Sequence, residues 1–132
     1  MDLFAIASYN SNWFFARVAR KQYEPVRVEG DCREDKWARV LLNGGTVRFY
    51  DAYAEGEEDF YGDLRHEYSW DDEAMYYFVT LDDVKVGLIK AWDKDEHSQS
   101  LVKKLFEDAA LIDNTDAEDL VQYIMFGKPI YG

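Results

Sequence analysis

The spacing of apolar residues changes along this chain, from runs typical of strands near the start to helical spacing near the end. One helix face near the C-terminus is predicted by Leu101, Val102, Leu105, Phe106 and Ala109. A second helix is predicted to begin with a capping box from Thr115 to Glu118 and to end at Gly127, and its apolar face contains Leu120, Val121, Ile124 and Met125. We therefore expect an α+β fold, in which an antiparallel β-sheet has a C-terminal helix pair packed on one face.

Several runs rich in aromatic and β-branched residues predict the strands of this sheet. They are residues 3–9, 13–20, 26–28, 46–53, 75–81 and 84–92. The first two are expected to form an antiparallel hairpin around the turn-favouring residues 10–12. The last two are expected to form a hairpin joined at Asp82 and Asp83.

Residues 31–43 allow two interpretations. The spacing of Trp37, Val40 and Leu41 favours a short helix that ends near Asn43, whereas the sequence Asn-Gly-Gly at residues 43–45 could instead close a hairpin. We favour the helix. Because the chain contains no internal repeat, low-complexity tract or linker, we expect residues 1–132 to form a single globular domain.

Charge is distributed unevenly along the chain, which has 15 Lys and Arg residues, 27 Asp and Glu residues and a formal net charge of -12. Residues 1–50 contain 8 basic and 6 acidic side chains, residues 51–83 contain 1 and 12, and residues 84–132 contain 6 and 9. So acidic a chain repels phosphate backbones and anionic lipid surfaces, which argues against direct binding to nucleic acid or membranes. Solubility alone does not require one quarter of the chain to carry nearly all of the net charge.

Cysteine usage and hydropathy indicate a reducing compartment. The single cysteine, Cys32, cannot form an internal disulfide, and the chain contains no Asn-X-Ser/Thr glycosylation acceptor. The first residues, MDLFAIASYN, lack a basic leader, and no apolar run approaches the length of about 18 residues that a membrane span needs. We therefore expect a cytoplasmic protein without a signal peptide or membrane span.

No motif in the chain predicts catalysis. His66 and Glu67 resemble the start of a zinc-protease helix, but Trp70 occupies the position of the second histidine. Residues 51–62 have the first aspartate and the sixth-position glycine of a calcium loop, but Gly62 stands where a bidentate glutamate is required. Neither match supports a metal site.

Two further polar groups have a structural explanation as well as a chemical one. Asp93, Asp95, Glu96 and His97 could hold a metal ion, but they precede a predicted helix, where carboxylates cap the helix and complement its dipole. Cys32 could act as a thiol nucleophile, although nothing in its local sequence resembles a nucleophile motif. We favour the structural interpretation of both groups and expect neither an enzyme nor a bound cofactor.

The segment EGEEDFYGDLRHEYSWDDE, residues 55–73, contains nine carboxylates and one arginine among large aromatic residues. Its carboxylates recur every four residues from Glu55 to Asp71, so a helix would align them as an acidic ridge beside an apolar one. Like charges at this spacing would destabilise the helix by roughly 0.2 to 0.5 kcal/mol a pair. Because Gly56 and Gly62 also weaken a helix, a loop with one helical turn is an equal alternative.

A basic partner would relieve this repulsion on binding, and aromatic residues of the segment would anchor the contact. Because a strongly basic protein surface is often one that holds nucleic acid, we expect a small inhibitor that blocks such a surface. Phage-encoded anti-CRISPR and anti-restriction mimics of DNA or RNA act in this manner. The expected partner-binding residues are Glu55, Glu57, Glu58, Asp59, Tyr61, Asp63, Glu67, Tyr68, Trp70, Asp71, Asp72 and Glu73.

Two other classes of function remain open. An immunity protein that neutralises a basic nuclease toxin would need the same acidic surface. A structural or assembly subunit would instead use exposed aromatic residues for self-association. The partner expected in the first two cases is a basic nuclease or nucleic-acid-binding defence protein.

Overall fold

The computed structural model describes residues 2–9, 11–54 and 66–131. Within these residues, the β-strands are β1 (Phe14–Arg17), β2 (Val47–Asp51), β3 (Tyr68–Trp70) and β4 (Met75–Val79). They form one antiparallel sheet in the order β1-β2-β4-β3, so β1 and β3 are its edges. The sheet confirms the strands predicted within residues 13–20, 46–53 and 75–81.

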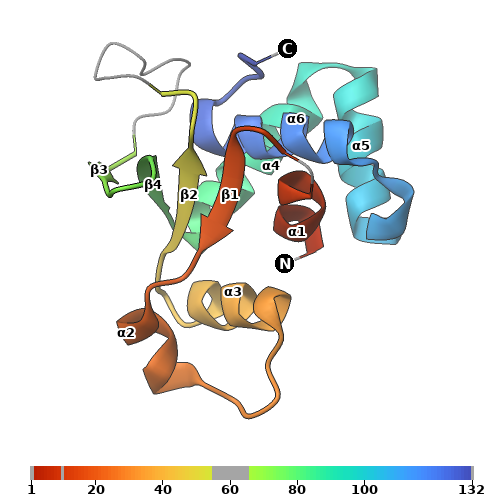
Figure 1. Cartoon of the computed structure of the whole chain (residues 1–132). Coiled ribbons are helices and arrows are strands. Elements are labelled where there is room, and N and C mark those ends of the chain that lie inside the picture. Colours follow the sequence, from red (N-terminus) through yellow and green to blue (C-terminus); the bar gives the residue numbers. More distant parts are fainter. Residues whose placement is uncertain (1, 10, 55–65, 132) are drawn as a thin grey trace.

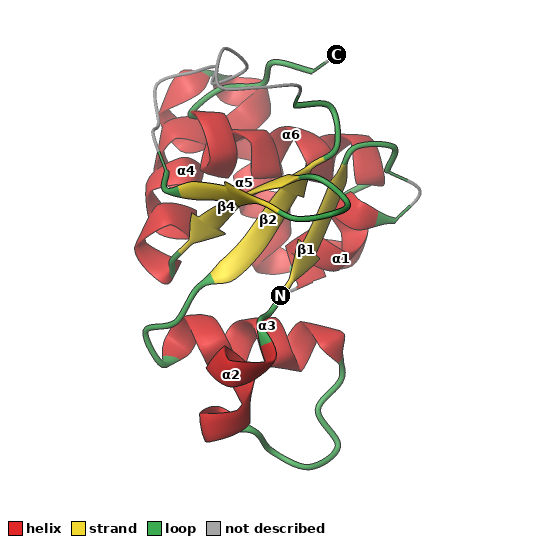
Figure 2. Cartoon of the chain, turned by 60° about the vertical axis from the view of Figure 1, so that its left-hand side comes forward, coloured by secondary structure: helices red, strands yellow, loops and turns green. Residues whose placement is uncertain are grey.

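Helices cover one face and one end of this sheet. They are α1 (Asp2–Ser8), α2 (Arg20–Tyr23), α3 (Arg33–Leu42), α4 (Leu81–Lys94), α5 (Glu96–Glu107) and α6 (Asn114–Phe126), with short 3-10 turns at Glu24–Val26 and Ala109–Leu111. α1, α4 and α6 lie on one face of the sheet, whereas α2 and α3 lie beyond one end of it (Figures 1 and 2). The predicted α+β fold, with C-terminal helices packed on an antiparallel sheet, is confirmed. No helix in the described ranges is long and apolar enough to cross a bilayer.

The core lies between the sheet and α6. Phe49, in the middle of β2, is fully buried, and its ring lies 4.7 Å from that of Phe4 in α1 and 5.1 Å from that of Phe14 in β1, both edge to face. α6 contributes Leu120, Ile124 and other side chains that are almost completely buried. This burial makes α6 the central helix of the fold, as its apolar pattern predicts.

α4 crosses α6 at very short range, and a glycine permits the approach. A methyl group added at Gly87 would lie 2.5 Å from Cα and 2.7 Å from the backbone nitrogen of Ile124. Carbon atoms in ordinary contact are about 3.5 to 4.0 Å apart, so no larger residue fits at position 87 without moving one helix. Val84, Leu88 and Ala91 are buried on the same side of α4.

A buried carboxylate ties the C-terminal residues to the sheet. Asp51, at the end of β2, has no exposed surface, and its side chain accepts hydrogen bonds from the Tyr131 hydroxyl at 2.6 Å and the Tyr53 backbone N–H at 3.0 Å. The Gln122 side-chain oxygen accepts hydrogen bonds from the backbone N–H groups of Ile130 and Tyr131, both at 2.7 Å. Residues after α6 are therefore bound back onto the core through polar groups.

The opposite face of the sheet carries aromatic and arginine side chains. Tyr50 and Tyr76 are buried there beside the half-buried Phe15 and Phe78, and the Phe15 and Tyr50 rings stack 4.4 Å apart. The Arg48 guanidinium lies 4.8 Å from the centre of the Tyr76 ring. Cation–π contacts of this kind cover the rings with charged groups that remain hydrated.

The structure corrects two predicted hairpins. Residues 3–9 do not form a strand, because α1 occupies this stretch and buries Leu3, Phe4 and Ala7 on one face. Residues 84–92 are part of α4, which begins with a capping box in which the Thr80 hydroxyl accepts a hydrogen bond from the backbone N–H of Asp83. Tertiary burial of a helical face outweighs the β propensity of these apolar runs.

Smaller corrections concern the ends of elements. The strand predicted at residues 26–28 is absent, since the 3-10 turn Glu24–Val26 includes its first residue. α6 is capped by Asp113 and not by Thr115, because the Asp113 carboxylate accepts the backbone N–H of Asp116 at 2.8 Å. The helix favoured for residues 31–43 is confirmed as α3, and Gly127 ends α6 with a φ of 79°, the left-handed conformation that glycine adopts readily.

Candidate functional site

The part of the acidic segment that the structure describes forms one side of a β-hairpin at the edge of the sheet. β3 pairs with β4 in the register Tyr68 to Tyr77 and Trp70 to Met75, and the backbone N–H of Phe78 donates to the carbonyl of Glu67 at 2.9 Å. Residues 71–74 form the turn between the strands. We call residues 67–73 the acidic hairpin arm, and Figure 1 shows β3 at the outer edge of the sheet.

Asp71 fixes the turn through both of its oxygen atoms. One oxygen accepts the backbone N–H groups of Glu73 at 2.8 Å and Ala74 at 3.1 Å. The other accepts the hydroxyl proton of Tyr50, a residue of β2, at 2.6 Å. The Tyr50 hydroxyl and these N–H groups lower the pKa of Asp71, so the carboxylate is held in its charged form.

Glu73 makes the second contact between the turn and the sheet. Its carboxylate lies 2.9 Å from the Arg17 guanidinium at the end of β1, and this hydrogen bond raises the pKa of Arg17. About half of each side chain is exposed to solvent, so the ion pair contributes little to stability. Together with Tyr50 and Asp71, however, it holds the turn over the aromatic face of the sheet. Sequence reasoning missed Arg17 and Tyr50, because each is distant in sequence from its partner.

Glu67, Trp70 and Asp72 are the other exposed side chains of the acidic hairpin arm. Glu67 and Asp72 are exposed, and their carboxylates make no hydrogen bond or ion pair with any described residue. Trp70 is 46% exposed, whereas Tyr68 is half-buried. The arm thus presents two exposed carboxylates beside a partly exposed tryptophan, on a turn whose conformation is already fixed.

The predicted partner-binding residues fall into two groups. Glu55, Glu57, Glu58, Asp59, Tyr61 and Asp63 lie outside the described residues, whereas Glu67 and Asp71 of the predicted acidic ridge lie within them. There the structure has neither of the two alternatives, a helix or a loop with one helical turn, since Tyr68, Ser69 and Trp70 form β3. Backbone pairing with β4 and the aromatic side chains of this stretch favour a strand over a helix with like charges four residues apart.

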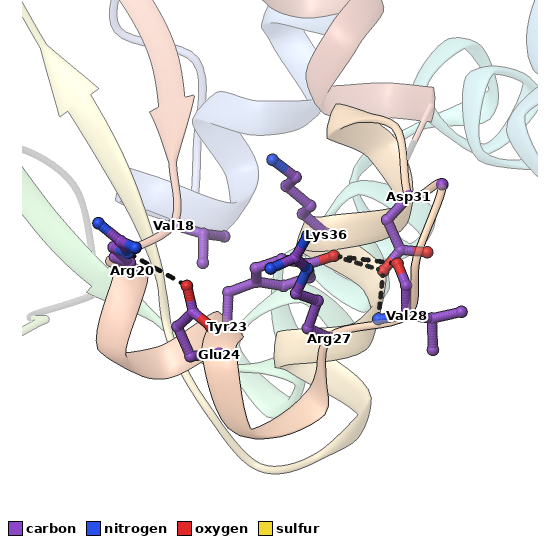
Figure 3. A pocket seen from close by; sticks show the side chains of 9 residues that line it. Val18, Arg20, Tyr23, Glu24, Arg27, Val28, Asp31 and Lys36 are labelled. Atoms are coloured by element: carbon purple, nitrogen blue, oxygen red, sulfur yellow. Dashed lines mark hydrogen bonds and ion pairs between the residues drawn. The ribbon is translucent and has the colours of Figure 1, made fainter.

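A pocket of about 380 Å³ lies between α2 and the loop that leads to α3 (Figure 3). The side chain of Asp31 is only 3% exposed, and one of its oxygens accepts hydrogen bonds from the Tyr23 hydroxyl and Arg39 Nε, both at 2.7 Å. These donors, Arg39 first, hold the pKa of Asp31 below its ordinary value. Lys36 lies above the Tyr23 ring, with Nζ 5.3 Å from the ring centre.

The charged side chains of this pocket mainly stabilise the local fold. Its two carboxylates are both engaged, because Glu24 pairs with Arg20 at 3.1 Å and Asp31 binds Arg39. Arg27 and Lys36 leave a local excess of positive charge, but a chain with a net charge of -12 opposes the approach of anions. The network instead fastens the loop before α3 to the helix itself.

His66 occupies a smaller pocket of about 250 Å³, lined also by Thr46, Thr80 and Asp83. Its Nε2 lies 2.8 Å from the carbonyl oxygen of Ile124, so Nε2 carries the proton and donates it to the end of α6. Nδ1 lies 3.6 Å from Oδ1 of Asp83. This geometry anchors the start of the acidic hairpin arm to the helical layer.

Cys32 and His97, the other two candidates for a chemical role, do not line these pockets. The backbone N–H of Asp35 acts to lower the pKa of the exposed Cys32 thiol, but the carboxylates of Asp35 and Glu34 outweigh it and raise that pKa. A raised pKa disfavours the reactive thiolate. Asp95 caps α5 by accepting the Ser98 backbone N–H at 2.7 Å, which confirms its structural interpretation.

Comparisons with other proteins do not assign this chain to a family. Searches against known protein families, curated proteins and solved structures found no match. Within the described ranges, no group of three or more His, Cys, Asp or Glu side chains is arranged to hold a metal ion. The feature that distinguishes this chain chemically is the acidic hairpin arm and the charge of the segment around it.

Proposed function

We propose that this protein is a small acidic inhibitor that binds the basic, nucleic-acid-binding surface of a partner protein in the cytoplasm. The observation that carries the proposal is the charge of residues 66–83, which contain six carboxylates and no lysine or arginine. Carboxylates concentrated in this way attract a basic surface and accelerate association with it. A phage-encoded blocker of a host nuclease or nucleic-acid-guided defence protein is the setting that this chemistry suits best.

The acidic hairpin arm supplies a preorganised contact surface. Hydrogen bonds from Tyr50 and from the turn backbone fix Asp71 before any partner arrives, so binding does not have to order this turn. Trp70 can bury its exposed surface against the partner, and partly exposed tryptophans are frequent anchors of protein interfaces. Glu67 and Asp72 would then pair with lysine or arginine side chains at the rim.

The sequence predicts that Asp71 and Glu73 contact the partner, but their contacts within the chain support another role in this mechanism. Each already has a partner within the chain, in Tyr50 and Arg17 respectively. We propose that both hold the turn and that Asp71 also contributes long-range attraction, whereas Glu67 and Asp72 make the direct contacts. Their separate contributions can be distinguished by substitution.

The test begins with an affinity pull-down from host extract, eluted with increasing salt. A captured nuclease or nucleic-acid-binding protein is then purified, and its affinity for the double variant Glu67→Gln, Asp72→Asn is measured. Each exposed ion pair contributes about 0.2 to 1 kcal/mol, so this variant should bind roughly 2- to 30-fold more weakly. The matched control neutralises Glu29 and Asp93, which are exposed outside the arm.

Both double variants have the same net charge, so they separate local contact from overall charge. The proposal requires the arm variant to lose much more affinity than the control. Equal losses would mean that only net charge matters, and unchanged affinity of both variants would exclude the arm from the interface.

A further inference from the structure

An apolar groove of about 330 Å³ runs between α4 and α5, on the helical side of the molecule. Its lining includes Ile89 and Trp92 from α4 and Phe106 from α5, which are 60%, 39% and 75% exposed. Leu88 and Val102 form its floor and are buried. These residues define a surface that we call the α4–α5 groove.

The exposed side chains of the α4–α5 groove form a contiguous apolar patch. A large aromatic side chain has about 150 to 250 Å² of surface to bury, so Ile89, Trp92 and Phe106 together expose on the order of 300 Å². That value lies in the range of the largest single apolar patch on typical monomers, where such patches are often functional. Hydration of these side chains costs free energy that a covering surface would recover.

The charge of this face differs from that of residues 51–83, which contain 12 acidic side chains and 1 basic one. α4 contains three lysines and three aspartates, and α5 contains two lysines and two glutamates, so both helices are neutral. The chain as a whole has a net charge of -12. Two copies would therefore meet less repulsion if they approached through α4 and α5 than through the acidic hairpin arm. A surface with equal numbers of opposite charges around an apolar centre can also complement itself, as a two-fold interface requires.

We propose that the α4–α5 groove is the interface of a symmetric homodimer, in which Phe106 of each copy packs into the groove of the other. An apolar centre of about 300 Å² per copy, on two helices that each have no net charge, suits the core of a standard interface of roughly 800 Å² per partner. In Figure 1, α5 and β3 lie at opposite sides of the molecule, so the dimer leaves both acidic hairpin arms exposed. The dimer is independent of the proposed inhibitory function.

Sedimentation velocity of the full chain, from about 5 to 500 µM, tests the proposal directly. The expected result is a monomer–dimer equilibrium with a dissociation constant on the order of 10 µM. Added salt should strengthen this dimer, because it screens the repulsion between two chains of net charge -12. This direction is opposite to the salt dependence expected for binding to a basic partner.

The variants Phe106→Ser and Ile89→Ser, Phe106→Ser should raise the dissociation constant of the dimer at least tenfold. The matched control is Leu42→Ser, which removes a side chain that is 71% exposed at the end of α3. All three positions are exposed, so thermal melts should show folded proteins. A sedimentation coefficient of a monomer up to about 500 µM, a dimer that the groove variants leave unchanged, or a dimer weakened by salt would each overturn the proposal.

Discussion

Replacement of Gly87 by alanine tests the helix crossing on which the fold depends. Two opposing effects follow from the structure. Alanine favours a helix over glycine by about 1 kcal/mol, so α4 alone would become more stable. The new methyl group, however, would lie 2.5 Å from Cα of Ile124, and α4 would have to move away from α6 by roughly 1 Å.

The packing cost should exceed the gain in helix propensity. Overpacking of a core usually destabilises by about 1 to 3 kcal/mol, and here the clash is with backbone atoms that cannot rotate away. Movement of α4 would also loosen the buried contacts of Val84, Leu88 and Ala91. We expect a net loss of about 1 to 2 kcal/mol in the free energy of unfolding, which corresponds to a decrease in Tm of about 3 to 8 °C.

Thermal and urea denaturation measure this effect, with Val86→Ala as the matched control. Val86 is the neighbouring residue of α4 and is 44% exposed, so its truncation should change Tm by no more than about 2 °C. The urea m-value of Gly87→Ala should equal that of the parent chain. If residues 84–92 were a strand, alanine at position 87 would be neutral or stabilising. A Tm of Gly87→Ala at or above that of the parent would therefore refute the close crossing of α4 and α6.

Three further substitutions probe buried and charged groups. Tyr131→Phe removes the 2.6 Å hydrogen bond to the buried Asp51 carboxylate and should lower the free energy of unfolding by about 1.5 to 3 kcal/mol in urea titrations. Asp31→Asn should lower Tm at pH 7, because Arg39 depresses the folded-state pKa of Asp31 below 3.8; the deficit should vanish as pH falls through that folded pKa. Asp119→Asn should raise Tm at pH 7, because burial raises the pKa of Asp119, and the gain should disappear in acid once this carboxylate is protonated in both states. A series of melts from pH 3 to 8 that showed the same sign for both aspartate variants would contradict these assignments.

Long segments with one dominant pattern were predictable from sequence. α5 and α6 have apolar faces with the helical period, and β2 and β4 are dense in aromatic and β-branched residues. α3 was favoured over a hairpin on the spacing of its three buried residues, and the structure places those residues inside. Local pattern and tertiary packing agree in α3, α6, β2 and β4, so either one indicates the structure. In α5 they agree only in part, because Leu101 and Val102 are buried whereas Phe106 of the predicted face is exposed.

Elements with conflicting signals were not predictable in the same way. The run from Val84 to Trp92 combines β-branched residues with a glycine, and that glycine suits a helix only because Ile124 passes close to it. A local signal was nevertheless present, since Thr80 and Asp83 form a capping box before the run. The prediction of a strand at residues 84–92 also gave no indication of the α4–α5 groove. Successive side chains of a strand point to opposite faces, so a strand would have divided the groove residues of this stretch between two faces.

The contacts of the acidic hairpin arm could not be predicted from composition. Sequence identifies the density of carboxylates but not that Asp71 receives the Tyr50 hydroxyl or that Glu73 meets Arg17. Both partners are distant in sequence and are brought close by the pairing of β1, β2 and β4. The division between carboxylates that hold the turn and those that face solvent is therefore a property of the fold.

The most direct test of the proposed function is a competition experiment with the captured partner and a labelled oligonucleotide bound to it. The chain should displace the oligonucleotide completely, and its own affinity should fall steeply as salt increases. The variant Glu67→Gln, Asp72→Asn should require a higher concentration than the Glu29→Gln, Asp93→Asn control. A stable ternary complex of partner, oligonucleotide and chain would contradict the claim that this protein occupies a nucleic-acid-binding surface.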